Sequence, residues 1–194
     1  MRKIETKLSQ EKKSKRNSLI VGAILIFVMV GSTFGIIINS FGNKNSSLDK
    51  ITYNGHEFNF QNNAWTLTAG KNTLSFVYNP LEVENLSGAI NGNLSYLNSY
   101  VSLPLYISTK DSYSGSEIYS VLSPFVERVQ IACYSDEACD SNIPTKDCTS
   151  NFIIIRESNA SSIYQNNKCV FITGQKQDLI KLTDLYLFKM LGIQ

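Results

Sequence analysis

Four cysteines carry the most distinctive chemistry of this chain. They all lie in the last third of the sequence and comprise Cys133, Cys139, Cys148 and Cys169. An even number of cysteines in an exported domain is typical of disulfide bonds, because thiols oxidise outside the cytoplasm. We therefore expect two disulfides, and the sequence leaves their pairing open because four cysteines allow three connectivities.

Zinc binding and thiol–disulfide exchange are the alternative uses of these cysteines. Five, eight and twenty residues separate successive cysteines, so the C-x-x-C spacing of zinc knuckles and of most redox pairs is missing. The single histidine, His56, lies far away in sequence. A redox function would use Cys133 and Cys139, which are the closest in sequence.

Enzyme chemistry finds little support in the other residues. His56 lies in a predicted hairpin strand, where we expect a structural role in place of a catalytic base. The acidic pairs Glu82 with Glu84 and Asp136 with Glu137 indicate solvated loops, and no glycine-rich phosphate loop is present. We predict no catalytic residues, no metal site and no cofactor.

An uncharged apolar stretch predicts the cellular location of the domain. Residues 19–38 are twenty residues without charge, enough for a helix to span the roughly 30 Å hydrocarbon core of a bilayer. Seven Lys and Arg against two Glu precede it, and the basic flank of a span stays in the cytoplasm. The sequence predicts a cytoplasmic tail (1–17), a signal anchor in the lipid bilayer (18–38), a flexible linker (39–50) and an extracytoplasmic domain (51–194).

Two alternatives concern the same stretch. A cleaved signal peptide would end at the small-residue site of residues 33–35, but the apolar run continues beyond it and favours an anchor. Gly31 and Gly35 form a small-xxx-small pair, through which the span could contact itself or another envelope protein. An accessory subunit held by its span alone is therefore a third functional hypothesis.

The charge of the exported part argues against nucleic acid as a partner. After residue 41 the chain has 11 Lys and Arg against 14 Asp and Glu, so the basic composition comes from the tail. No basic stripe remains to neutralise phosphates. The candidate N-glycosylation sites Asn45, Asn85, Asn93 and Asn159 each open an N-x-S/T sequon on the exported side.

The first half of the exported domain has the pattern of a β meander. Asn54-Gly55 separates two short strands and suits a tight primed turn. Apolar residues then recur at every second position from residue 65 to 78, on either side of Gly70. We expect about four antiparallel strands with one buried and one wet face, followed by a poorly defined connector over residues 81–100.

The second half alternates strands and helices. We expect strands over residues 101–108 and 129–133, and a helix between them that a capping box of Ser114 and Glu117 begins. Continuous apolar runs at residues 152–155 and 169–172 predict central strands covered on both faces. A closing helix over residues 176–191 ends at Gly192, and its solvated face is expected to carry Lys181, Asp184 and Lys189. The fold class is α+β: an antiparallel meander plus a small α/β unit with a C-terminal helix.

These features together resemble a loose group of uncharacterised single-pass, membrane-anchored surface proteins of archaea. The resemblance rests on the basic start and span, on the hairpin segment Tyr53 to Phe58, and on the closing segments 167–172 and 184–192. It implies an archaeal cell membrane and no activity. The sequence therefore predicts a non-enzymatic binding or assembly module of the cell envelope, with an extracytoplasmic thiol–disulfide protein as the alternative.

Overall fold

The structure is a computed structural model that describes residues 50–135 and 139–194 of the 194-residue chain. The predicted tail, anchor and nearly all of the linker, with Gly31, Gly35 and Asn45, lie outside the described residues. Within the described part, no helix is long and apolar enough to cross a membrane.

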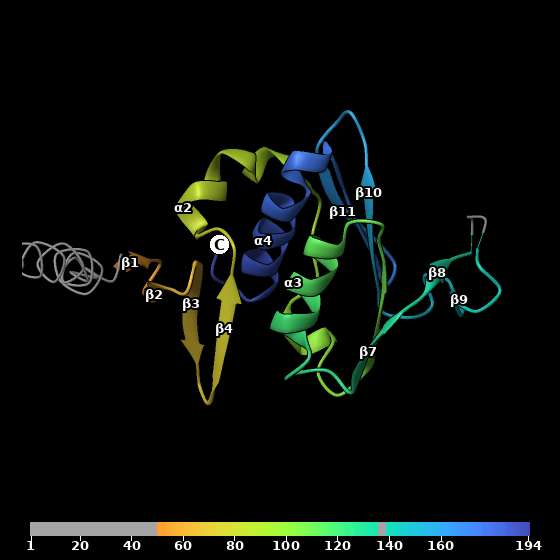
Figure 1. Cartoon of the computed structure of the whole chain (residues 1–194), viewed down its shortest axis with the longest axis horizontal. Coiled ribbons are helices and arrows are strands. Elements are labelled where there is room, and N and C mark those ends of the chain that lie inside the picture. Colours follow the sequence, from red (N-terminus) through yellow and green to blue (C-terminus); the bar gives the residue numbers. More distant parts are fainter. Residues whose placement is uncertain (1–49, 136–138) are drawn as a thin grey trace, which may run out of the picture. The chain divides into compact units, whose positions relative to one another are not determined.

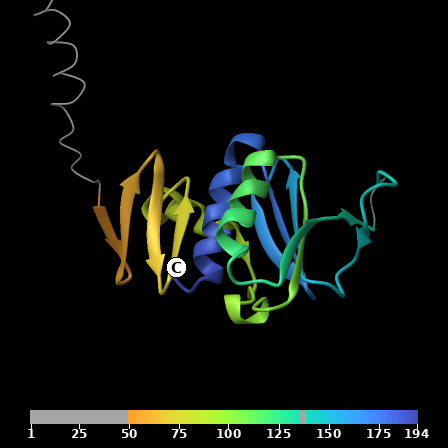
Figure 2. The same ribbon diagram turned by 60° about the horizontal axis from the view of Figure 1, so that its bottom comes forward.

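Two β-sheets enclose the C-terminal helix α4 (Leu179–Met190) from opposite sides (Figures 1 and 2). The first is a four-stranded antiparallel meander in chain order. Its strands are β1 (Lys50–Tyr53), β2 (His56–Gln61), β3 (Ala64–Ala69) and β4 (Asn72–Phe76). The predicted meander is confirmed.

The meander forms for the reasons that its sequence suggests. Asn54 and Gly55 have φ angles of 45° and 81°, the left-handed conformation that a tight primed turn requires. Across the strands, Phe58 pairs with Leu67 and Leu67 with Leu74, and all three are buried. Threonine, serine and other polar residues occupy the opposite face, so the apolar face alone packs against the rest of the domain.

The second sheet has six strands in the order β5-β11-β12-β10-β6-β7. The strands are β5 (Ile90–Asn91), β6 (Pro104–Ser108), β7 (Arg128–Ile131), β10 (Phe152–Glu157), β11 (Ser162–Asn166) and β12 (Cys169–Gly174). The central strand β10 runs parallel to β6 and β12, whereas β11 is antiparallel to β12. The apolar run of residues 152–155 is at most 2% exposed, which confirms a strand covered on both faces.

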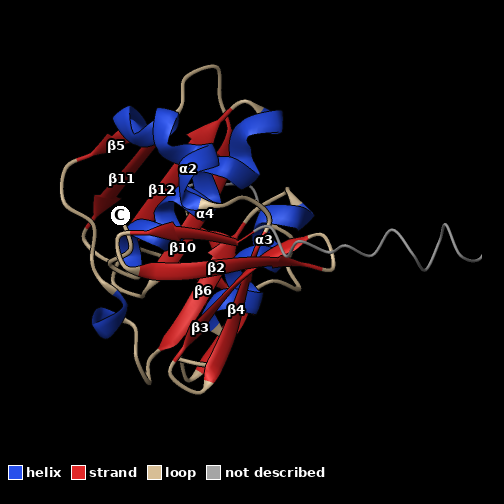
Figure 3. Ribbon diagram, turned by 90° about the vertical axis from the view of Figure 1, so that its left-hand side faces the viewer, coloured by secondary structure: helices blue, strands red, loops and turns tan. Residues whose placement is uncertain are grey.

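The helices lie between the sheets or at their ends (Figure 3). Besides α4 these are α2 (Pro80–Val83), α3 (Ser112–Leu122) and the 3-10 turns η1 (Glu84–Ala89), η2 (Leu97–Ser99) and η3 (Lys176–Asp178). The capping box expected at Ser114 is wrong. Asp111 caps α3 by accepting a hydrogen bond from the Ser114 N–H at 2.8 Å, so the helix begins earlier, and Glu117 turns instead to Val77.

Helix α4 confirms the predicted closing helix and corrects its environment. Gly192 follows it with a φ of 73°, as a left-handed cap requires. Asp184, expected on a solvated face, is 0% exposed. The reason is that both sheets, α2 and α3 cover α4 on several sides. Of the three residues expected on the solvated face, only Lys181 and Lys189 are partly exposed.

Candidate functional site

The structure pairs the four cysteines as Cys133–Cys139 and Cys148–Cys169. Two disulfides were expected, and the structure gives the pairing that the sequence left open. Both bonds belong to one excursion of the chain, the arm, which we define as residues 133–148. The arm contains the short strands β8 (Cys133–Tyr134) and β9 (Thr145–Lys146), which pair in parallel.

The disulfides hold the two ends of the arm in different ways. Cys133–Cys139 closes a short loop within the arm. Cys148–Cys169 ties the end of the arm to β12, and Cys169 is 0% exposed. A polar segment of this length would not stay folded by its own apolar contacts, so the covalent bonds fix it against the sheet.

Five aromatic rings form a continuous row on the outer face of the six-stranded sheet, four from its strands and one from the arm. We call this set the aromatic row; in spatial order it comprises Tyr164, Phe171, Tyr134, Phe152 and Tyr106. Successive ring centroids are 4.8, 5.7, 6.0 and 6.4 Å apart. The first pair is stacked and the other three are edge-to-face, which are the favoured geometries for aromatic contacts.

The two ends of the row differ in character. Tyr164 is 38% exposed at one end. At the other end, the ammonium of Lys146 lies 4.7 Å from the centroid of the Tyr106 ring, and the Arg128 guanidinium donates to the Tyr106 hydroxyl at 3.3 Å. The hydrogen bond from Arg128, together with the charge of Lys146, lowers the pKa of Tyr106. The row therefore runs from one exposed ring, Tyr164, through the buried ring of Phe152 to Tyr106, which is 5% exposed and lies at a cationic edge.

A pair of carboxyl groups, buried Asp184 and half-buried Glu117, lies elsewhere, where β4 meets α3 and α4. Asp184 Oδ2 accepts a hydrogen bond from the Tyr78 N–H at 2.8 Å, and Glu117 Oε1 accepts one from the Val77 N–H at 3.0 Å. Burial and then the Glu117 charge raise the pKa of Asp184 well above its usual range, and burial also raises the pKa of Glu117. Both shifts favour the protonated form of the pair, and that of Asp184 is the larger.

This acid pair joins consecutive backbone amides at the end of β4 to two helices. Asp184 has no exposed surface, so substrate has no access to its carboxyl group. The geometry suits a structural clamp sensitive to pH and does not suit acid–base catalysis on a bound molecule.

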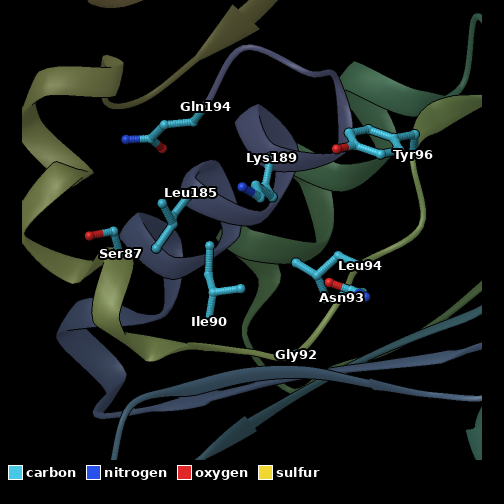
Figure 4. A pocket seen from close by; sticks show the side chains of 9 residues that line it. All are labelled: Ser87, Ile90, Gly92, Asn93, Leu94, Tyr96, Leu185, Lys189 and Gln194. Atoms are coloured by element: carbon cyan, nitrogen blue, oxygen red, sulfur yellow. The ribbon is translucent and has the colours of Figure 1, made fainter.

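A cavity of about 420 Å³ opens beside α4 (Figure 4). One wall comes from Leu185 and Lys189 of α4, and the opposite wall from Ile90 and Leu94 on and after β5. Gln194 and Asn93 lie among its polar lining residues. The cavity is separate from the aromatic row and shares no residue with it.

The other predicted site residues are scattered. Asn85, Asn93 and Asn159 are exposed, Asn93 at the cavity, and His56 is half-buried on β2. The sidechain of Glu82 accepts a hydrogen bond from the Asn79 N–H at the start of α2 and is thereby part of a helix cap. Asp136 and Glu137 lie outside the described residues. In the described part of the chain, no cluster of metal-ligating side chains occurs.

Sequence reasoning missed both the aromatic row and the cavity. The row draws on four strands and the arm, and only the continuous apolar run of residues 152–155 indicated that the outer face of the sheet is also buried. No family model, curated protein or solved structure matches this chain significantly, so its function has to be inferred from these residues.

Proposed function

We propose that this chain is a non-enzymatic binding module of a cell envelope. Residues 18–38 anchor it in the membrane, and the domain of residues 51–194 faces outward from the cytoplasm. Three features support this: the basic flank of an uncharged apolar stretch, the two disulfides, and the resemblance to archaeal surface proteins.

The aromatic row is the observation that carries the proposal. Tyrosine and arginine dominate the energetics of protein interfaces, because they bury large surfaces and hydrogen-bond at the same time. Here exposed Tyr164 stacks on Phe171, and Arg128 lies at the far end of the same face. The disulfides keep this surface rigid, which reduces the entropy lost on binding.

We assign the surface to an acidic segment of another envelope protein. Lys146 and Arg128 form its cationic edge, and Arg128 forms an ion pair with Glu127, whose carboxylate lies 3.5 Å away. That ion pair is solvent-exposed, with both side chains more than half accessible, so a partner carboxylate can replace it at little cost.

Site-specific photo-cross-linking tests the assignment. A photoreactive phenylalanine replaces Tyr164 in the full-length chain within its own membrane, and Tyr119, an exposed tyrosine on α3, serves as the matched control position. We expect one cross-linked protein from position 164 and none from position 119. Adding Arg128→Glu and Lys146→Glu should abolish the product, because both substitutions reverse the charge of the edge.

The proposal fails in either of two outcomes. Equal cross-linking from positions 164 and 119 would mean that contact at the aromatic row is unspecific. A product that survives both charge reversals would show that acidic groups of the partner are not recognised there.

A thiol–disulfide protein using Cys133 and Cys139 is the second candidate. The observation in its favour is accessibility: both cysteines of this pair are partly exposed, whereas Cys169 of the other pair is fully buried. Exchange requires a thiolate to reach a disulfide sulfur, so an exposed bond reacts first.

Graded reduction of the native full-length chain separates the two functions. We expect mild dithiothreitol to open Cys133–Cys139 before Cys148–Cys169, as measured by alkylation and peptide mass, because attack on Cys169 requires local unfolding. A redox function additionally requires the opened pair to reduce a disulfide in a second protein. If the double variant Cys133→Ser with Cys139→Ser still cross-links from position 164, this disulfide only stabilises the arm and is not required for partner binding.

A further inference from the structure

Strand β7 forms one edge of the six-stranded sheet. It is the last strand in the order of that sheet, and among the described strands it pairs only with β6. The Ala132 N–H donates to the Ile107 carbonyl at 2.9 Å, on the β6 side. Backbone groups of successive residues in a strand point to opposite edges, so those of Val129 and Ile131 face away from β6.

These outward groups have no partner among the described residues. Neither Val129 nor Ile131 takes part in any hydrogen bond to a described residue outside the ladder with β6. The chain then leaves the sheet, because the Cys133 N–H donates to the Pro144 carbonyl instead. At the opposite edge, β5 has only two residues, so β7 offers the longer edge for a further strand.

The outer face of this edge is cationic. Arg128 and Gln130 are exposed there, and Arg128 donates to the Tyr106 hydroxyl. The ammonium of Lys146 lies over the ring of the same tyrosine. A strand added beside β7 would place its outer-face side chains next to Arg128, and opposite charges on neighbouring strands attract each other. Acidic side chains are therefore favoured at these positions of an added strand.

The inner face of the edge is apolar. Ile131 is in register with the core residue Ile107 of β6, yet it is 51% exposed because no described strand lies beyond it. Val129 is in register with Leu105 and is half-buried. The inner-face side chains of an added strand would cover Ile131, so aliphatic residues are favoured there.

We propose that β7 binds an extended segment of the partner protein in which acidic residues alternate with aliphatic residues. The backbone of this segment pairs with the N–H and C=O groups of Val129 and Ile131 and so extends the sheet. Its carboxylates lie beside Arg128, and its aliphatic side chains cover Ile131, as the alternation of side chains along a strand requires. This inference rests on the proposed function, because it gives the acidic partner a conformation and a place on the domain.

Amide NMR of the full-length chain in detergent tests the proposal. The probe is a pentapeptide of alternating glutamate and valine with blocked ends. We expect saturable shifts and slower hydrogen exchange of the Val129 and Ile131 amides, and no change at Ser120, an exposed position on α3. A probe with lysine in place of glutamate should bind at least about tenfold more weakly, because its charges repel Arg128.

Ile131→Pro removes one outward N–H group and leaves the ladder with β6 intact, since proline is tolerated where the N–H of an edge strand faces solvent. Affinity for the probe should fall at least about fivefold, as expected for one hydrogen bond. Ile131→Val is the matched control, because it keeps the N–H and a branched aliphatic side chain, and it should bind like the unchanged chain. A second probe with every peptide nitrogen methylated keeps its side chains but lacks donors, so it should not bind the unchanged chain. This comparison holds even if Ile131→Pro fails to fold.

Three results would each overturn the addition of a strand: equal affinity of folded Ile131→Pro and Ile131→Val, binding of the methylated probe, or no saturable shifts at millimolar probe. Equal binding of the lysine probe would overturn the acidic class of the segment. Cross-linking from position 164 reads the proposed function separately. A cross-link that folded Ile131→Pro leaves intact contradicts strand addition alone. Failure of the unchanged chain to cross-link contradicts the proposed function, even where the probe binds β7.

Discussion

Replacing Phe188 by alanine is expected to lower the free energy of unfolding by about 3–5 kcal/mol, the usual cost of truncating a fully buried aromatic residue. Phe188 is 0% exposed, and its ring centroid lies 4.7 Å from that of Phe76 and 5.8 Å from that of Phe58. These three rings are the main aromatic contact between α4 and the meander. Urea unfolding followed by circular dichroism measures the loss.

Phe171→Ala is the matched control for this prediction. Phe171 is only half-buried and belongs to the aromatic row on the outer face of the other sheet. Its truncation should cost clearly less stability and should impair cross-linking from position 164 instead. Faster amide exchange in β2 and β3 is expected only for Phe188→Ala. Similar losses for both variants would contradict the central role of α4 as the shared core.

The acid pair is expected to make the domain more stable in mild acid than at neutral pH. Folding raises the pKa of Asp184 and of Glu117, so the folded state binds protons more strongly than the unfolded state. The resulting stability is complete below the ordinary carboxyl pKa and is lost as the pH rises through the raised pKa of Asp184. Around it lie Glu117 of α3, Glu82 of α2 and the Tyr78 N–H.

Asp184→Asn should flatten this pH dependence. The asparagine Oδ1 can still accept from the Tyr78 N–H, and its amide can donate to an ionised Glu117, so that no proton has to be retained. Thermal unfolding measured between mild acid and neutral pH should show a melting temperature that falls for the unchanged chain and stays level for the variant. Asp140→Asn, an exposed acid on the arm, is the control and should keep the original slope. A variant that retains the full slope would contradict the assignment.

Local signals were sufficient for most of the fold. Alternating apolar residues and the Asn54-Gly55 turn predict the meander because register and turn chemistry act over a few residues. The apolar run of residues 152–155 predicts a strand buried on both faces for the same reason. Strand β11 was missed, because its alternation spans only five residues between two turn signals.

The sites could not be predicted in the same way, because they depend on contacts between distant segments. Asp184 follows a helical pattern that places it with Lys181 among polar positions, and only the packing of β4 and α3 against α4 buries it. The aromatic row needs the connectivity Cys148–Cys169 to bring the arm over the sheet. The cavity needs Gln194 next to residues of β5 and α4.

The burial of α4 between both sheets has a consequence for how the chain can be made. The Asp184 carboxyl group accepts a hydrogen bond from the Tyr78 N–H, which lies 106 positions earlier in the sequence. The Asn54 side-chain amide donates to the carbonyl of Ile193, 139 positions later. Synthesis proceeds from the N-terminal side, so the meander emerges with its apolar face bare and acquires a core only after α4 has followed. A ribosome stalled before residue 179 should therefore display a protease-sensitive meander.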